Sequence, residues 1–151
     1  MDQLFSKALT LLTSKNLTTL ELRQQLESEF SSLNDIDTLI DETINKLNDL
    51  HLINDNHIAE SLARRYSHKG DLFIKRKLSQ KGMSDESIEL AIQELEPERN
   101  RALSEARKKL QTLKGLDIHA IESKLVKFLS GRAFSSVACF DAVKTIKEEL
   151  P

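Results

Sequence analysis

Glycine and proline are scarce in this chain of 151 residues, which has four glycines and two prolines, one of them the last residue. Sheet proteins need many turns, and turns favour these residues. The abundant leucine, lysine, glutamate, alanine and glutamine favour helices instead. Tryptophan is absent and aromatic residues make up only 5% of the chain, so the core must be mainly aliphatic. The composition therefore predicts an all-α protein.

The residue patterns that carry catalysis or hold a cofactor are missing as well. The four histidines form no His-Glu-x-x-His pair and no cluster with Cys139, the single cysteine, so no zinc site is expected. No glycine-rich phosphate loop is present, and no nucleophile is paired with a base at a recognisable spacing. We therefore expect a binding protein without enzymatic activity, cofactor or metal, in which Cys139 is a buried small hydrophobe.

Long hydrophobic runs are also missing. No segment approaches the roughly 20 apolar residues needed to span a bilayer, and the N-terminus has neither the basic region nor the apolar run of a signal peptide. A single cysteine permits no internal disulfide, in keeping with a reducing compartment. These absences predict a soluble cytoplasmic protein with no membrane partner.

Helix punctuation is frequent and predicts nine helices. Thr18-Thr19-Leu20-Glu21 reads as a capping box, in which the threonine and glutamate side chains satisfy each other's backbone amides. Gly70 is expected to end the fourth helix in a left-handed conformation, with Asp71 capping the fifth. Pro97 suits the first turn of the seventh helix. The predicted starts are near Asp2, Thr18, Asn34–Asp37, Asn54, Asp71, Ser84, Pro97, Asp117, and Ser135 or Ser136.

Two parts of the chain resemble each other at a constant offset of 51 residues. Ile74 and Leu78 match Leu125 and Leu129, and the apolar positions that follow also match. A unit of about 45 residues buries too little surface to be very stable alone, so such units must pack together. We expect an elongated, curved tandem array of three three-helix repeats, covering residues 1–52, 53–96 and 97–151. A compact bundle with coincidental similarity is the alternative.

Charge is unevenly placed, although the net charge is only −2. The first repeat is acidic, with nine acids and one base between Glu27 and Glu60, whereas Arg64 to Lys81 holds seven bases and one acid. Charge runs are usually solvated helix faces, but a tandem array repeats its exposed positions along one side and so forms a long basic surface. The predicted partner-binding residues, called the basic set below, are Arg64, Arg65, Lys69, Lys75, Arg76, Lys77, Lys81, Arg107, Lys108, Lys127 and Arg132.

The order and spacing of several motifs resemble the RecX family, bacterial regulators of the recombinase RecA. The strongest matches are Leu47-Asn-Asp-Leu-His-Leu-Ile-Asn-Asp-Asn-His-Ile-Ala59 and Ile74-Lys-Arg-Lys-Leu-Ser-Gln-Lys-Gly-Met83, and the earlier Glu21-Leu-Arg-x-x-Leu26 also fits. This sequence departs from the family pattern at several positions. His51 and Ala133 stand where the family has glycine, Asn54 replaces an aspartate, and Ile58 replaces an aromatic residue.

The resemblance implies three tandem three-helix repeats that bind in the helical groove of the RecA–single-stranded DNA filament. It implies slower filament growth, less ATP hydrolysis and strand exchange, and a damped SOS response. A monomer is expected, and a weak contact with single-stranded DNA is compatible with this role. Two alternatives stay open: a helix-turn-helix protein that reads duplex DNA through the turns at Gly82 and Ala133, and a generic helical scaffold for another protein.

Overall fold

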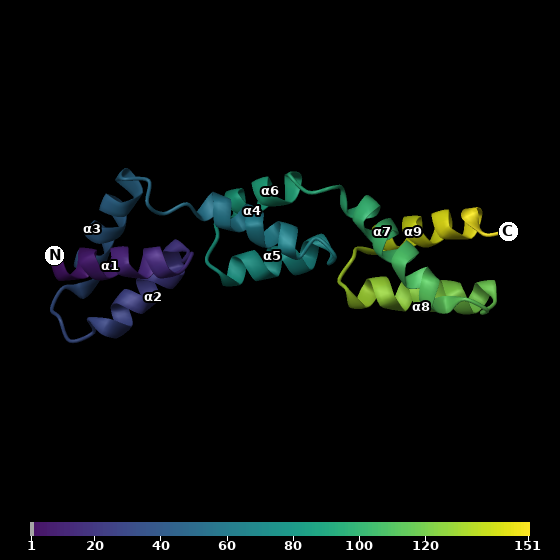
Figure 1. The fold of residues 1–151 in the computed structure, drawn as a ribbon, viewed down its shortest axis with the longest axis horizontal. Coiled ribbons are helices and arrows are strands. Elements are labelled where there is room, and N and C mark those ends of the chain that lie inside the picture. The colour runs from purple at the N-terminus through teal and green to yellow at the C-terminus, as the bar shows by residue number, and fades with distance from the viewer. Residues whose placement is uncertain (1) are drawn as a thin grey trace.

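The computed structural model describes residues 2–151 and confirms the all-α class. Within these residues there are nine α-helices, one short 3-10 helix and no strand. Figure 1 shows the helices in three groups of three, which we call unit 1 (α1–α3), unit 2 (α4–α6) and unit 3 (α7–α9). The helices are α1 (Asp2–Ser14), α2 (Thr19–Glu29), α3 (Ile36–Asp49), α4 (Asp55–Arg65), α5 (Asp71–Gln80), α6 (Asp85–Gln93), α7 (Glu98–Leu110), α8 (Ile118–Gly131) and α9 (Ser136–Glu149), with the 3-10 helix at Gln111–Leu113.

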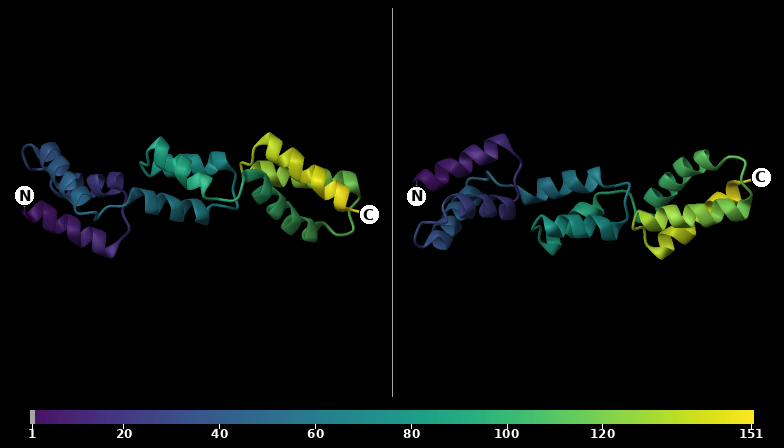
Figure 2. Two further views of the ribbon diagram at one scale, coloured as in Figure 1. Left: turned by 90° about the horizontal axis from the view of Figure 1, so that it is seen from above. Right: turned by 90° about the horizontal axis from the view of Figure 1, so that it is seen from below.

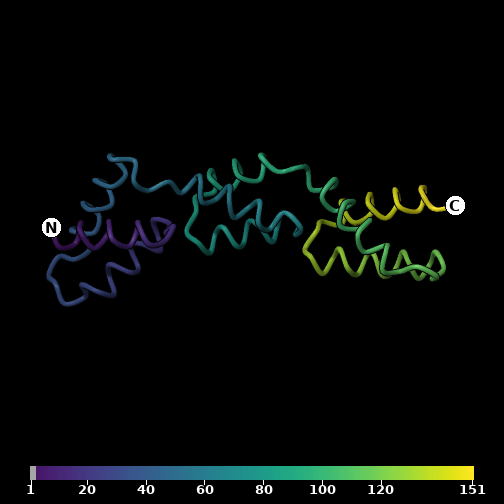
Figure 3. The backbone as a smooth tube through the Cα atoms, in the orientation of Figure 1, coloured from purple at the N-terminus to yellow at the C-terminus, as the bar shows by residue number. Residues whose placement is uncertain are grey.

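The three units follow one another in a line, with the two ends of the chain at opposite ends of the molecule (Figure 1). The turned views in Figure 2 and the backbone tube in Figure 3 show the same elongated shape. Each unit has its own hydrophobic core. The three buried clusters run from Leu4 to Leu47, from Ala59 to Ala91, and from Ala102 to Ile146. This arrangement is consistent with the tandem array predicted from the sequence, whose exact boundaries stay a prediction.

Units 2 and 3 repeat the same turn between their second and third helices. Gly82 and Ala133 both have positive φ, 84° and 64°. The amide of the next residue donates to the carbonyl five residues earlier in both turns, from Met83 to Leu78 and from Phe134 to Leu129. These are the bonds of a Schellman ending. Ser84 and Ser135 then cap α6 and α9 by accepting from the amide three residues on, so the offset of 51 residues extends to backbone geometry.

The predicted ending of the fourth helix is wrong. α4 ends at Arg65, and Gly70 has an ordinary φ of −72° as the N-cap of α5, so Asp71 is the first helical residue rather than the cap. Pro97 likewise precedes α7 as its N-cap. A Cβ on Gly70 would overlap the backbone of Ala133 and Phe134. Glycine is therefore needed at position 70 for a close approach between units, which local sequence does not reveal.

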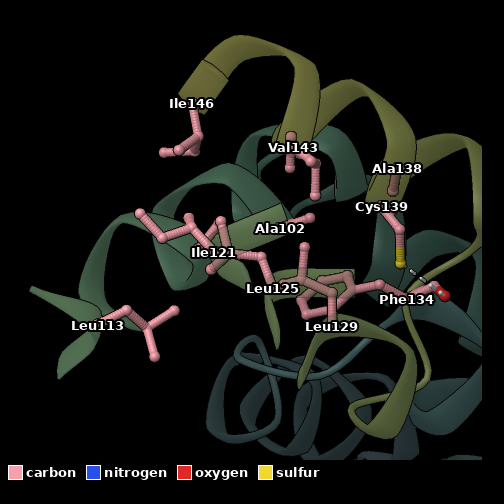
Figure 4. Packing of buried hydrophobic residues seen from close by; sticks show 12 residues of the cluster. Ala102, Leu113, Ile121, Leu125, Leu129, Phe134, Ala138, Cys139, Val143 and Ile146 are labelled. Carbon is pink, nitrogen blue, oxygen red and sulfur yellow. Dashed lines mark hydrogen bonds between the residues drawn. The ribbon is translucent and has the colours of Figure 1, made fainter. Parts of the chain in front are cut away.

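Cys139 lies in the core of unit 3, as predicted. Figure 4 shows it among Leu129, Phe134 and Ala138, with its thiol directed to the Phe134 carbonyl oxygen, 3.6 Å away. Burial raises the pKa of this thiol above its ordinary value, and the charge of Glu98 acts in the same direction. Cys139 is thus a neutral packing residue.

Candidate partner-binding surface and the junctions that position it

The junction between units 1 and 2 is made by polar contacts at a helix start. The Thr18 hydroxyl donates to the Lys81 carbonyl oxygen at 2.9 Å, and the Thr19 amide donates to the Asp55 carboxylate at 3.0 Å. The predicted capping box is confirmed, since Thr18 and Glu21 accept from each other's amides. Glu21 also binds the Lys81 ammonium group at 2.9 Å. One capping motif therefore both starts α2 and attaches unit 1 to unit 2.

The junction between units 2 and 3 repeats this chemistry at equivalent positions. The N-cap of α5, Gly70, donates its amide to the Arg132 carbonyl oxygen at 2.8 Å. The first helical residue, Asp71, donates its amide to the Glu98 carboxylate at 2.9 Å. Lys81 and Arg132 are related by the 51-residue offset, and Asp55 and Glu98 each begin the first helix of their unit. The same junction thus occurs twice, so successive units are attached in the same way.

A buried arginine adds strength to the second junction. The Arg101 side chain is only 6% exposed and forms an ion pair with Asp71. Its guanidinium also donates to the backbone carbonyl oxygens of Ser67 at 3.1 Å and Lys69 at 2.6 Å, and its Nε donates to the backbone carbonyl oxygen of Glu96 at 2.8 Å. The planar fork of arginine suits several acceptors at once, so this residue of α7 holds the loop between α4 and α5.

The ion pair at the first junction, between Glu21 and Lys81, is more exposed than the pair between Arg101 and Asp71. Burial by itself would raise the pKa of the Glu21 carboxyl, but the hydrogen bond and charge of Lys81 and the Thr18 amide outweigh it. The pKa of Glu21 is therefore lower than its ordinary value of 4.5. The contact with Lys81 therefore favours the ionised form of the Glu21 carboxyl group.

Five members of the basic set form ion pairs within the protein. Lys75 pairs with Glu89, Lys81 with Glu21, Arg107 with Glu149, and both Lys108 and Arg132 with Glu105. Two more lie against an aromatic ring, with the ammonium groups of Lys69 and Lys77 at 5.1 and 5.6 Å from the centre of Phe73. For Lys81, whose ammonium group pairs with Glu21 across the first junction, a structural role explains part of its presence. The Arg132 guanidinium pairs with Glu105 within unit 3.

The remaining four members, Arg64, Arg65, Arg76 and Lys127, are exposed and form no ion pair within residues 2–151. Their positions repeat. Arg76 and Lys127 are related by the 51-residue offset, and aligning the starts of α4 and α7 places Arg64 and Arg65 at the positions of Arg107 and Lys108. Ala59 and Ala63 then match Ala102 and Ala106, all fully buried, which supports this alignment. Bases thus recur at equivalent surface positions of units 2 and 3.

The helices after the two tight turns are poorly suited to reading DNA. In unit 2, α6 begins with the acids Asp85 and Glu86, which would repel phosphates. In unit 3, α9 presents Val137 and Phe140, which are 71% and 68% exposed. A recognition helix places polar or basic side chains in the major groove near its start. These helices favour a protein partner over direct readout of a duplex.

Several residues of this surface could not be found by reading the sequence. The contacts of Thr18, Gly70 and Arg101 with other units depend on how the units meet. The exposed apolar side chains of unit 3 were also missed, although comparing the two repeats would have shown Val126 and Phe140 at the positions of Lys75 and Glu89. Residues 2–151 contain no cluster of three or more side chains that could hold a metal ion. None of the described helices is long and apolar enough to cross a bilayer.

These features define the class as an elongated all-α protein of serial three-helix units with recurrent bases. Models of known protein families gave no match to the chain. Individual proteins of similar sequence were found. The chain is 32% identical over 135 residues to the regulatory protein RecX of Chlorobium phaeobacteroides, a match that covers 87% of this chain and 85% of that protein. It is 34% identical over 118 residues to the regulatory protein RecX of Streptococcus uberis, covering 75% of this chain but only 43% of the relative.

Solved structures agree with these relatives. The crystal structure of RecX from Lactobacillus salivarius matches with a TM-score of 0.82 and 28% identity, over 97% of this chain and 96% of the other. A second crystal structure of a regulatory protein RecX has a TM-score of 0.76 at 24% identity, over 98% of this chain and 71% of the other, and supports the fold. The chain belongs to the RecX family, as its motifs suggested.

Proposed function

We propose that this protein regulates the bacterial recombinase RecA by binding in the helical groove of the RecA–single-stranded DNA filament. Binding restrains filament growth, ATP hydrolysis and strand exchange, and so damps the SOS response. The relatives carry the name regulatory protein RecX, and RecA is the partner that this family resemblance implies. The role places the protein in the cytoplasm, and it needs no catalytic group.

The observation that carries the proposal is the linear arrangement of units with bases at equivalent positions. A filament presents the same surface at regular intervals, so a ligand with repeated, similarly attached units can contact neighbouring subunits at once. Linked contacts of this kind increase binding without new chemistry at any one site. A ligand that bridges subunits shifts the filament toward whichever conformation it binds more tightly.

Within the basic set, the four residues without an internal ion pair are proposed to contribute most to binding. Arg64, Arg65, Arg76 and Lys127 have no ion pair to break when they meet a carboxylate or phosphate, and Arg64 gives up only a 3.3 Å hydrogen bond to the Ser61 hydroxyl. Lys75, Lys81 and Arg107 must first break a contact within the protein. Lys69, Lys77, Lys108 and Arg132 add to the positive potential of the surface.

The first test is ATP hydrolysis by the cognate RecA on single-stranded DNA during titration with this protein. Inhibition below one copy per RecA subunit would support action on the filament. Inhibition together with equally tight binding to free DNA would indicate competition for DNA instead. A folded protein with no effect at micromolar concentration would overturn the proposal and leave the generic scaffold.

The basic set is tested by the triple variant Arg64→Glu, Arg76→Glu, Lys127→Glu. We expect inhibition to need at least about tenfold more protein, because charged contacts at an interface each contribute on the order of 1 kcal/mol. The matched control is Lys15→Glu, Arg99→Glu, Lys114→Glu, which changes the net charge equally at exposed bases outside the set. Equal loss in both variants would mean that overall charge, and not this surface, determines binding.

A further inference from the structure

A groove runs along the outside of unit 3 between α8 and α9. It has a volume of about 440 Å3 and an apolar floor formed by Ile118, Val126, Phe140 and Val143. Val126 is 41% exposed and Phe140 is 68% exposed. Single exposed apolar residues are ordinary on a protein surface, but apolar side chains gathered in a groove mark an interaction site.

The fold does not require apolar residues at these positions. At the equivalent positions of unit 2, the chain carries Lys75 and Glu89, which form an ion pair of 3.5 Å across α5 and α6. Unit 3 has Val126 and Phe140 there, and Val137 replaces Glu86 in the same comparison. Two copies of one backbone arrangement thus have opposite surface chemistry. If these positions faced only water, charged side chains such as those of unit 2 would be favoured. The apolar side chains of unit 3 therefore indicate a surface that a partner covers.

A second, separate hollow lies between units 2 and 3. This cleft is lined by Lys75 and Arg76 from α5 and by Ser130 and Ser136 from unit 3, together with the acids Asp71 and Glu98. Ser130 and Val126 are four residues apart on α8, as are Ser136 and Phe140 on α9, so each pair lies on one helix face. The apolar groove and the cleft with two members of the basic set therefore follow one another along the same faces of α8 and α9.

The charges without a partner inside the protein are unevenly placed along this surface. The end at unit 2 carries Arg76, which has no ion pair within the described residues, and Lys144 follows along α9. The two acids that line the cleft are engaged, since Asp71 pairs with Arg101 and Glu98 accepts from the amides of Asp71 and Ser135. Toward the far end of α9, Glu122 and Lys147 neutralise each other at 3.0 Å, which leaves the acid Glu148 beside them. An occupant that matches this pattern has apolar residues along its length and acids at the end that faces unit 2.

We infer that the groove between α8 and α9 binds an amphipathic protein segment of a recombinase subunit, with its apolar residues on Val126 and Phe140 and its acidic end at Arg76 and Lys144. This inference rests on the proposed function and adds to it a site outside the basic set. The apolar contact fixes the position of unit 3 on the filament. The bases contribute attraction that depends on salt, whereas the apolar contact does not.

The test is the double variant Val126→Lys, Phe140→Glu, which gives unit 3 the charged pair that unit 2 already has. Its folding is expected to be preserved, with unchanged helix content and melting temperature, because both side chains are exposed. Binding to the cognate RecA–single-stranded DNA filament is expected to weaken about tenfold or more, as for loss of an aromatic anchor. The loss should be similar at low and high salt, while the loss caused by the charge-reversal triple variant shrinks as salt rises.

The control is Leu90→Glu, which replaces an exposed leucine of unit 2 by a charged residue. It is expected to leave filament binding within about twofold of the wild type. A double variant that binds like the wild type, beside a wild type that does bind, would overturn this inference alone. A wild type that fails to bind the filament would overturn the proposed function and the inference with it. Self-association of the wild type that the double variant abolishes, measured by sedimentation, would assign the groove to a second copy and also overturn the inference.

Discussion

Five of the described residues have positive φ: Asp35, His51, Gly82, Gly115 and Ala133. Three of them, His51, Gly82 and Ala133, form the same turn after a helix, and only one of these three is glycine. Gly82 has a φ of 84°, whereas His51 and Ala133 have φ of 57° and 64°. The amides of Leu52, Met83 and Phe134, which follow these residues, each donate to the carbonyl five residues earlier. His51 and Ala133 are the two positions where the sequence departs from the glycine of the RecX pattern. The backbone keeps its turn at these positions despite the cost of a side chain.

Replacing Ala133 by glycine should relieve this cost. A side chain in the left-handed region costs about 1–2 kcal/mol, which glycine avoids. The greater conformational freedom of glycine in the unfolded chain offsets part of this stabilisation. We expect Ala133→Gly to raise the free energy of unfolding by about 1 kcal/mol or less, seen as a higher urea midpoint. The reverse change, Gly82→Ala, should lower stability, because the added Cβ also overlaps Leu20. A lower midpoint for Ala133→Gly would contradict the strain argument.

At the scale of elements, helix starts attach one unit to the next. The N-caps Thr18 and Gly70 and the residues after them donate to carbonyl and carboxylate oxygens of the following unit. These starts leave backbone amides without partners inside the helix, so a neighbouring unit can satisfy them. Because the hydrophobic clusters remain within units, the polar contacts at helix starts set the direction of the array.

Among the residues of the second junction, we expect Arg101 to contribute most to stability. Truncation by Arg101→Ala leaves the Asp71 carboxylate and the carbonyl oxygens of Ser67 and Lys69 without their donor. We expect a loss of about 3 kcal/mol, the usual scale for breaking a buried ion pair, measured by chemical denaturation. The variant Arg101→Lys should recover little of the lost stability, because lysine lacks the planar guanidinium that reaches several acceptors at once.

The control for Arg101 is Arg99→Ala, which removes an exposed arginine two residues earlier on α7. It is expected to change stability by less than about 0.5 kcal/mol. A similarly small effect of Arg101→Ala would show that the buried network does not hold the two units together.

At the scale of the whole molecule, the array is three cores joined by two junctions, and the first junction is expected to respond to pH. The first junction depends on the Glu21 carboxylate, whose pKa is lowered by Lys81 and Thr18. A carboxyl group whose pKa falls on folding stabilises the folded form above its ordinary pKa. That contribution is lost as the pH drops below 4.5 through the lowered folded-state value. Unit 1 should therefore loosen from unit 2 on acidification.

This prediction is checked by hydrogen exchange at the Thr18 amide, which donates to the Glu21 carboxylate, between pH 7 and pH 3.5, after correction for intrinsic exchange. Protection of this amide should fall as Glu21 becomes protonated. The matched control, Glu21→Gln, should have weaker protection at neutral pH and little further change on acidification. The same pH response in the wild type and the control would exclude Glu21 as the group responsible.

The sequence by itself determined the helical class, the starts of most helices and the 51-residue repeat, because these depend on local propensity, capping and the spacing of apolar residues such as Ile74 and Leu78. It also identified the family and where bases concentrate. Only the tertiary structure decided which bases are already paired, since Lys81 and Glu21 are 60 residues apart in the chain. It likewise decided why position 70 is glycine and which exposed residues share one groove. Contacts between units join residues distant in sequence, and no local pattern encodes such distances.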